Sequence, residues 1–373
     1  MSTERLNYEY KGMLEFEKFG FASPDVYIYD SNENYLVTAF LDGYEPLIDE
    51  LQRHEIDPNT AVIIGSMLGH VHSSTHEEIV PKSQHDIRKK QYSNNEHFEL
   101  WNEFFFPMSL KRLHDIDSIK QTDEVAPFGH DHYELVKKFC KDNENNNKGS
   151  IQKWIKGIQQ VQSVYMNKKT TMVHADLHCN NIMVKRSGRS GRNSNDNDVC
   201  DLMSTKMIDF EKFAMGPPGL DLGQFLANYI WFWPTGDSDH ILENALNECW
   251  DNYIESFTYH AKWQCKVNNR CLLPETEYMI IEDTLHDAVG FLGWWLLTLN
   301  LACPVDVMPL QSDYSPWLIP TVRTKQLEIA TTLLEAYVDQ EKVLFKDLIA
   351  LVSNVLCTSP ISNKIHQVDG REF

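Results

Sequence analysis

VHADLHCNNIMV (173–184), followed further along the chain by IDFE (208–211), is the pair of segments that decides the fold. The first segment supplies a carboxylate, Asp176, and a carboxamide, Asn181, directly before an apolar run of the kind found in strands. The second segment supplies two more carboxylates. Hard oxygen ligands of these types suit Mg²⁺, which binds one or two carboxylates together with the phosphates of a substrate.

The order of these residues is more informative than any one of them. Asp209 and Glu211 stand with one residue between them, beyond the strand that follows Asn181. The layout H-x-D-x-x-x-x-N, then a strand, then an acidic pair is typical of the catalytic half of a phosphotransferase of protein-kinase-like design. An H-x-D triplet alone is common by chance, and His174 alone indicates packing. Together, the segments predict that Asp176, Asp209 and Glu211 converge on a magnesium-bound triphosphate.

Length and charge set broad limits. A chain of 373 residues suits one large or two modest domains, and 42% hydrophobic residues supply a sizeable core. The formal net charge of −20 argues against non-specific binding to nucleic acid or anionic membranes, which requires basic surface. A polyanion such as ATP would need metal ions or a local basic pocket. We expect a small-molecule substrate and no nucleic-acid or membrane partner.

Cysteine usage and hydropathy favour a cytoplasmic protein. The eight cysteines are scattered without a C-x-x-C pair, and residues 1–20 are charged and aromatic rather than basic and then apolar. Residues 288–305 carry almost no charge and reach the length of a membrane-spanning helix. They include Gly290, Gly293 and Asn300 and have no flanking Lys or Arg, so we predict a helix buried inside a helical lobe.

Periodicity predicts a short mixed segment at the start of the chain. Apolar and aromatic residues at helix-like spacing indicate a helix over 4–19. Apolar runs at 26–29 and 35–40 indicate two strands joined by a turn over 30–34.

The rest of the chain is predicted to be mainly helical, with a solvated loop over 142–149. Residues 185–198 contain no apolar side chain and predict a long hairpin insertion between two strands rather than a phosphate-binding loop. The main helices are expected over 59–73, 151–166, 220–230, 241–258, 280–300 and 325–352.

Several strings resemble the aminoglycoside-phosphotransferase and choline-kinase superfamily, and within it the methylthioribose kinases. They are the two segments above, YEYKG (8–12), the run from Asp209 to Gly223 and LHD with GF (285–291). The resemblance implies an α+β, protein-kinase-like bilobal fold with a truncated small β lobe and a large helical lobe. Residues 1–43 would form the small-lobe remnant and hinge. Residues 44–373 would form the large lobe, with the catalytic loop at 173–184 and the metal segment at 207–223.

The resemblance also implies roles for individual residues around ATP and Mg²⁺. Asp176 would accept the proton of the substrate hydroxyl or orient that hydroxyl. Asp209 and Glu211, with Asn181, would hold Mg²⁺ against the phosphates, and Phe210 would lie in the same nucleotide-binding segment.

Further positions follow from the same resemblance. The hinge at 37–41 would meet the adenine through the backbone of Thr38, Ala39 and Phe40. Glu9 would be the helix carboxylate that pairs with a strand lysine. His178 would shape the catalytic loop, and Asp221 would brace it.

Two departures from the family pattern qualify these expectations. The glycine-rich loop and strand lysine that precede the small-lobe helix in such kinases have no counterpart in this sequence. We therefore expect either a piece or alternative-start product of a longer kinase or a degenerate relative, with an exposed sheet edge and an open apolar face. The sugar-binding arginines of methylthioribose kinases are replaced by Thr298-Leu299 beside Trp294 and Trp295, although Arg323 and Lys325 lie shortly after.

Three functional hypotheses remain open at this stage. The first is a kinase acting on a thiosugar hydroxyl in methionine salvage, with a homodimer as a possible assembly. The second is a catalytically impaired or regulatory binding protein that keeps the pocket. The third is a kinase for choline, an aminoglycoside or a related alcohol, in which an aromatic cluster could enclose a quaternary ammonium group. That cluster comprises Trp231, Phe232, Trp233, Trp294 and Trp295.

Overall fold

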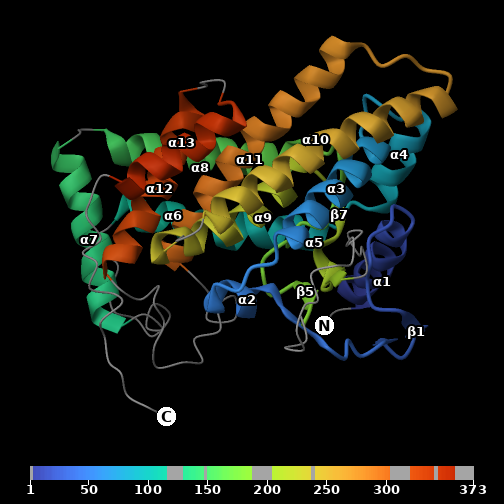
Figure 1. The fold of residues 1–373 in the computed structure, drawn as a ribbon, viewed down its shortest axis with the longest axis horizontal. Helices are drawn as coiled ribbons and strands as arrows, with labels where there is room; N and C mark the ends of the chain where they lie inside the picture. Colours follow the sequence, from blue (N-terminus) through green and yellow to red (C-terminus); the bar gives the residue numbers. More distant parts are fainter. Residues whose placement is uncertain are drawn as a thin grey trace, which may run out of the picture.

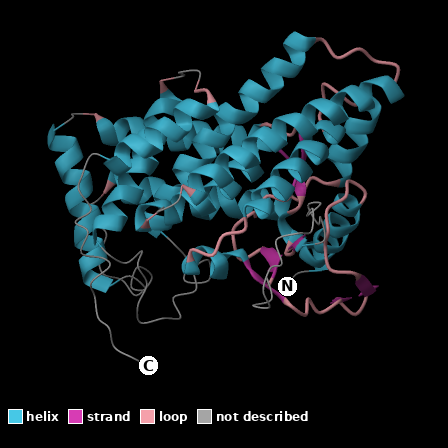
Figure 2. Cartoon of the chain, viewed as in Figure 1, coloured by secondary structure: helices cyan, strands magenta, loops and turns pink. Residues whose placement is uncertain are grey.

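The computed structural model describes residues 3–115, 129–146, 149–186, 204–236, 240–302, 320–339 and 343–357. Helices form most of the molecule, and the strands lie in the right half of the view, with β1 and β5 low near α1 and β7 higher up (Figures 1 and 2). The chain therefore has an α+β, kinase-like fold with a large helical lobe.

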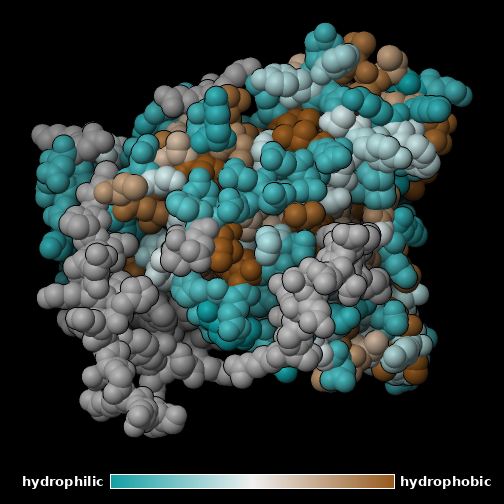
Figure 3. All heavy atoms as spheres, viewed as in Figure 1, coloured by the Kyte–Doolittle hydropathy of each residue, from teal (hydrophilic) through white to brown (hydrophobic). Residues whose placement is uncertain are grey.

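The N-terminal segment contains helix α1 (Thr3–Glu17) and the antiparallel strands β1 (Val26–Asp30) and β2 (Tyr35–Thr38). This two-stranded sheet pairs with no other described strand. Its apolar side chains are largely exposed, up to 66% for Tyr27, which agrees with the open apolar face expected from the sequence. In the space-filling view, hydrophobic atoms reach the surface at the lower right, where Figure 1 places β1, although most of this face is hydrophilic (Figure 3).

A second and a third small sheet belong to the helical lobe. Strand β3 (Tyr44–Pro46) pairs with β5 (Ile182–Lys185), which pairs with β6 (Thr205–Met207), all antiparallel. Strand β4 (Thr171–Val173) pairs with β7 (Ala214–Gly216). The predicted boundary at residue 43 falls between the N-terminal hairpin and the first of these sheets.

Helix α1 is packed closely against the segment that follows β6. Gly12 of α1 lies against the Phe210 side chain, where a Cβ would come within 2.6 Å, so this helix tolerates no side chain at that position. Phe16 of the same helix contacts Phe210, Phe213 and His174 edge-on, so α1 covers the segment that precedes β7.

The remaining helices form one packed lobe with a continuous buried core. In that core α3 lies along α10, and α11 lies between α9 and α12 (Figure 1). The described helices of the lobe are α2 (Leu47–Arg53), α3 (Pro58–Thr75), α4 (Lys82–Gln91), α5 (Asn95–Leu100), α6 (Phe106–His114), α7 (Gly129–Asn146), α8 (Ser150–Asn167), α9 (Pro218–Phe232), α10 (Ile241–Val267), α11 (Pro274–Ala302), α12 (Pro320–Val338) and α13 (Phe345–Cys357). Short turns of π or 3-10 helix lie at η1 (Trp101–Phe105), η4 (Phe210–Lys212) and η5 (Trp233–Thr235).

The structure corrects two of the predicted elements. The loop predicted over 142–149 begins later, because α7 continues to Asn146: the polar run DNENN is also compatible with a solvated helix end. The single helix predicted over 325–352 is two helices, α12 and α13, which pack against each other. Most of the hairpin insertion predicted over 185–198 lies outside the described residues, but β5 and β6 do flank it.

The apolar segment 288–305 is a helix in the protein interior as far as it is described. Its part in α11 includes Ala288, Leu292 and Trp294, all fully buried. In the described residues, no helix is long and apolar enough to cross a membrane.

Candidate active site

The β5–β6 hairpin brings the two halves of the predicted site together. Ile182 pairs with Met207, so Asn181 before β5 and Asp209 after β6 lie at the same end of the hairpin. The backbone N–H of Ile208 donates to the carbonyl oxygen of Asn181 at 3.0 Å. Asp209 itself has φ 63° and ψ 58°, a left-handed conformation that Asp tolerates better than most residues and that turns the chain into η4.

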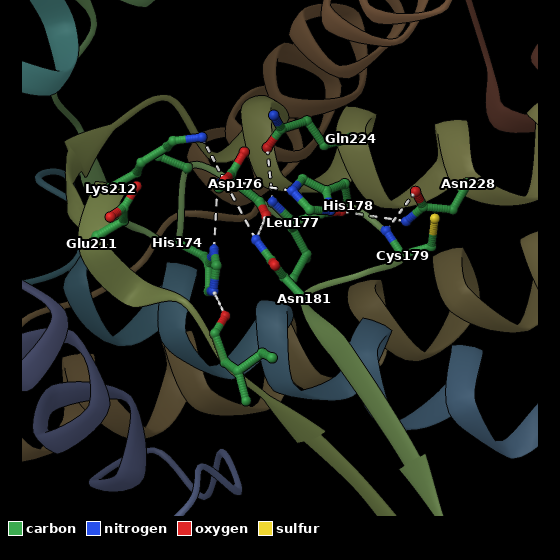
Figure 4. Close-up of polar contacts among 12 residues, drawn as sticks. His174, Asp176, Leu177, His178, Cys179, Asn181, Glu211, Lys212, Gln224 and Asn228 are labelled. Carbon is green, nitrogen blue, oxygen red and sulfur yellow. Dashed lines mark hydrogen bonds and ion pairs between the residues drawn. The ribbon is translucent and has the colours of Figure 1, made fainter. Parts of the chain in front are cut away.

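Helix α9 holds the loop that carries Asp176 through three polar side chains. The carboxylate of Asp221, fully buried, accepts the backbone N–H groups of His174 and Ala175, both at 2.8 Å. One and two turns further on, Gln224 accepts the N–H of Leu177 and Asn228 accepts that of Cys179 (Figure 4). These loop amides would otherwise be unsatisfied in the interior, which costs roughly 1–3 kcal/mol for each group. The bracing role expected of Asp221 is present in the structure.

His174 links the loop to the segment before Asp209. Its Nε2 donates to the carbonyl of Ile208 at 3.0 Å, while its Nδ1 accepts the N–H of Asp176 at 3.3 Å (Figure 4). Burial lowers the pKa of this imidazole, although three neighbouring aspartates oppose the shift. A neutral His174 with its proton on Nε2 satisfies both contacts, so this residue links the loop to the strand β6 end.

Asp176 is buried and ionised. Burial would raise the pKa of its carboxyl, but the ammonium group of Lys212 and the imidazole of His178 outweigh burial and hold that pKa well below its usual range. Its Oδ2 lies 2.5 Å from Lys212 Nζ and 3.6 Å from His178 Nε2, and Asn181 Nδ2 donates to it at 3.4 Å (Figure 4). Its Oδ1 is buried and has no hydrogen-bond partner among the described residues. One carboxylate oxygen therefore receives no donor from this part of the protein.

The predicted metal ligands divide into two groups. Asn181 uses its Nδ2 on Asp176, so its Oδ1 and the carboxylate of Asp209 are the oxygens offered at the end of the hairpin. Glu211 is instead paired with Arg5 of α1. In the described part of the chain, no three His, Cys, Asp or Glu side chains are grouped as a metal site made of protein ligands alone would require. The convergence of Asp176, Asp209 and Glu211 on a magnesium-bound triphosphate stays a prediction.

Glu9 of α1 provides the test of whether a cation fits beside Asp209. Burial and the charge of Asp209 raise the pKa of Glu9 to about 8, against hydrogen bonds from the backbone of Phe210 and Asp209. Its Oε2 is buried without a hydrogen-bond partner among the described residues. With a pKa of about 8, Glu9 is largely protonated at neutral pH, so the carboxylate offered to a divalent cation is that of Asp209, together with Asn181 and substrate oxygens.

The predicted hinge follows strand β2, and one of its backbone groups is already used. Strand β2 ends at Thr38, and the N–H of Ala39 donates to the carbonyl of Asp25 at 2.7 Å. Phe40 is 91% exposed. Adenine recognition by these three residues stays a prediction, and it would rest on the groups of 38–41 other than the Ala39 N–H.

An aromatic stack begins beside Lys212. The Nζ atom of Lys212 lies 5.8 Å from the ring centroid of Trp101. The Trp101 ring stacks on Trp295 and contacts Trp294. The indole N–H groups of Trp101 and Trp294 are buried without a partner. Arg323 contacts Asn300 and the Trp231 ring, and Lys325 contacts the Val355 carbonyl and Glu328, so both cations are committed within the helical lobe.

Sequence reasoning missed Lys212, Gln224 and Asn228. Gln224 and Asn228 could have been found, because with Asp221 they are polar residues at helical spacing in the otherwise apolar run GLDLGQFLANYIWF. No comparable signal marks Lys212, whose partner depends on how η4 turns.

Comparisons with known proteins agree with this geometry. The model of the Ecdysteroid kinase-like family matches residues 69–231. A methylthioribose kinase of Bacillus velezensis is 27% identical over 192 residues, which cover 50% of this chain and 42% of that protein. One from Bacillus cereus strain B4264 is 26% identical over 164 residues, or 42% and 36% of the two chains.

The family match covers the part of the chain that carries the site, and the chain spans less than half of the length of each of these two relatives. The family match includes Asp176, Asn181, Asp209 and the bracing helix α9 up to Trp231. Taken with the α+β fold and its large helical lobe, the matches show a kinase-like protein that is similar to methylthioribose kinases.

Proposed function

We propose that this protein is a small-molecule kinase that transfers the γ-phosphate of ATP to a hydroxyl group, with S-methyl-5-thioribose as the acceptor. The observation that carries the proposal is the ionised carboxylate of Asp176. It is held beside the hairpin end that presents Asn181 and Asp209, and its Oδ1 is unoccupied by any protein donor. The acceptor is taken from the relatives named methylthioribose kinase.

The chain's own groups suit this chemistry. An acceptor hydroxyl would donate to Asp176 Oδ1, which aligns its oxygen for attack. Because Asp176 is a weak base with its pKa held low, orientation is its main contribution, and it takes the proton late, once the new bond has acidified the hydroxyl. Mg²⁺, when bound at Asp209 and Asn181, would neutralise charge on the phosphates.

A second acceptor class has its own observation in support. Trp101, Trp294 and Trp295 extend from Lys212 into the helical lobe, and two of their indole N–H groups lack partners. The three side chains are at most 5% exposed, so an apolar ring system carrying several hydroxyl or carbonyl groups would meet these N–H groups only by displacing part of the packing. The Ecdysteroid kinase-like family match is consistent with such an alcohol.

Phosphate transfer by the purified chain tests the proposal and separates the acceptors. ADP release would be measured with Mg-ATP and, in parallel, S-methyl-5-thioribose, an ecdysteroid, choline and an aminoglycoside. Turnover with the thiosugar alone supports the first acceptor, and turnover with the ecdysteroid alone supports the second. Mg-ATP binding by calorimetry without turnover on any acceptor would instead identify a regulatory binding protein and overturn the proposal.

A further inference from the structure

Lys212 stands at the centre of the site, although the function proposed above assigns it no role. It is the last residue of η4 and reaches across to the Asp176 carboxylate (Figure 4). The Nζ–Oδ2 distance is 2.5 Å, and the lysine side chain is 20% exposed. Asp176, on which phosphate transfer would depend, is thus paired with a cationic side chain of the protein.

The loop does not need Lys212 for its shape. Its backbone is already held by Asp221, Gln224 and Asn228 from α9, and by His174. The hydrogen bond found for Lys212 Nζ goes to the Asp176 side chain, not to the loop backbone. Lys212 therefore stabilises the negative charge at Asp176 Oδ2, and it would also lie close to a ligand bound beside that oxygen.

The unpartnered Oδ1 fixes where the reacting groups would lie relative to Lys212. An acceptor hydroxyl on Oδ1 would place its oxygen about 3 Å from that atom, on the same carboxylate that Lys212 contacts through Oδ2. The reacting phosphorus would lie a further ~3 Å away. An ammonium group has three donors, and one on Oδ2 leaves two for oxygens of the transferring phosphoryl group.

We propose that Lys212 is a catalytic residue that binds the phosphoryl group while it passes from ATP to the acceptor. This inference rests on the function proposed above. The bond between the γ-phosphorus and the oxygen bridging to the β-phosphate breaks, and a bond to the acceptor oxygen forms. The hydroxyl proton passes to Asp176 and then to solvent, while Lys212 keeps its protons. Charge on the equatorial oxygens is stabilised by a donor already in place.

Steady-state kinetics of Lys212→Met and Lys212→Arg test the proposal. We expect kcat of Lys212→Met to fall about 100- to 1,000-fold, as when one preorganised donor is removed from a developing anion. The KM for Mg-ATP should change less than about threefold, and Lys212→Arg should recover at least about tenfold of the lost kcat. Lys206→Met is the matched control, since Lys206 on the adjoining strand β6 donates to the carbonyl of Ser23.

Two results would overturn the inference while leaving the proposed function intact. One is a kcat of Lys212→Met that lies within threefold of the wild-type kcat. The other is a kcat loss that vanishes as the pH is raised to 9, because Lys212 would then only tune the ionisation of Asp176. A wild-type protein that binds Mg-ATP and transfers phosphate to none of the four acceptors would overturn the function, and the role of Lys212 with it.

A binding measurement covers the case in which Lys212→Met leaves a buried carboxylate unpaired and fails to fold. Asp176→Asn and the double variant Asp176→Asn/Lys212→Met both lack that carboxylate. Titration with Mg-ADP, with and without fluoroaluminate as a mimic of the transferring phosphoryl group, compares them. We expect fluoroaluminate to tighten ADP binding to the single variant at least tenfold more than to the double variant. Equal tightening would contradict a contact between Lys212 and the phosphoryl group.

Discussion

Helix α9 holds one side of the Asp176 loop with neutral and ionised side chains that accept its backbone N–H groups, all of them deep in the lobe. On the other side, η4 and α1 approach with ion pairs: Lys212 on Asp176 and Arg5 on Glu211. Arg5 is 39% exposed, whereas Asp221 is fully buried. A ligand can replace partly exposed ion pairs far more easily than buried backbone hydrogen bonds. The α9 side thus acts as a scaffold, and the η4 side is where ligands would bind.

The largest expected effect is on stability, from Asp221→Ala on the scaffold side. The change removes the acceptor of two buried N–H groups and a neighbour of His72 Nε2, which lies 3.6 Å from Asp221. We expect a loss of about 3–5 kcal/mol in the free energy of unfolding. Urea unfolding would show it as a lower midpoint with an unchanged m-value. Asp251→Ala, at an exposed position on α10, is the control, and equal midpoints for the two variants would refute the scaffold role.

Asp176→Asn should give the next largest effect, on turnover rather than on folding. The amide keeps the shape of the side chain but removes the negative charge that orients the hydroxyl and accepts its proton. We expect kcat to fall at least about 100-fold, within the range for loss of a general base, with an unchanged far-UV circular dichroism spectrum. Turnover within tenfold of the wild type would show that Asp176 does not act on the acceptor.

The two sides also differ in how much the sequence revealed about them. The family resemblance carried by residues 173–184 and 208–211 implied the α+β kinase-like fold. The H-x-D-x-x-x-x-N spacing, the strand after Asn181 and the acidic residues that follow predicted that Asn181 and Asp209 lie near each other, and the β5–β6 pairing places them at one end of the hairpin. The brace from Asp221 was likewise expected. That brace followed from the family resemblance and not from periodicity.

The partners of the charged side chains could not be predicted from the sequence in the same way. Whether Glu211 faces a metal or Arg5 depends on the rotation of η4 against α1, which is fixed by contacts such as Gly12 against Phe210. A long side chain such as Lys212 can reach several partners from one backbone position. For the same reason the division of the 325–352 region into two helices was missed, because Val338 and Phe345 are both apolar and the periodicity continues across the break.

Glu9→Gln tests the raised pKa of the Glu9 carboxyl, which lies beside Asp209 on the η4 side. A carboxyl whose pKa is raised from 4.5 to about 8 on folding contributes stability that is fully present below pH 4.5 and is lost as the pH rises through 8. The neutral amide lacks this dependence. We therefore expect the stability of Glu9→Gln relative to wild type to increase between pH 6 and pH 9, on the order of 2 kcal/mol.

Thermal unfolding of both proteins at pH 6, 7, 8 and 9 would measure this difference, and a difference independent of pH would contradict the raised pKa. Mg²⁺ provides a second arm. A cation on Asp209 lowers the pKa of the neighbouring Glu9, so the gain of Glu9→Gln over wild type at pH 9 should shrink when Mg-ATP is added.

Arg5→Met should have the smallest effect on stability, below about 1 kcal/mol, because the pair with Glu211 is partly exposed. Its effect on metal binding separates two roles for Glu211. If Glu211 joins Asp209 and Asn181 around Mg²⁺, Arg5 competes with the metal, and its removal should lower the Mg²⁺ concentration needed for half-maximal ATP binding, by roughly two- to fivefold. If Glu211 only anchors α1, that concentration should stay unchanged. Glu211→Gln distinguishes the cases independently, since it would weaken Mg-ATP binding only when its carboxylate contacts the metal.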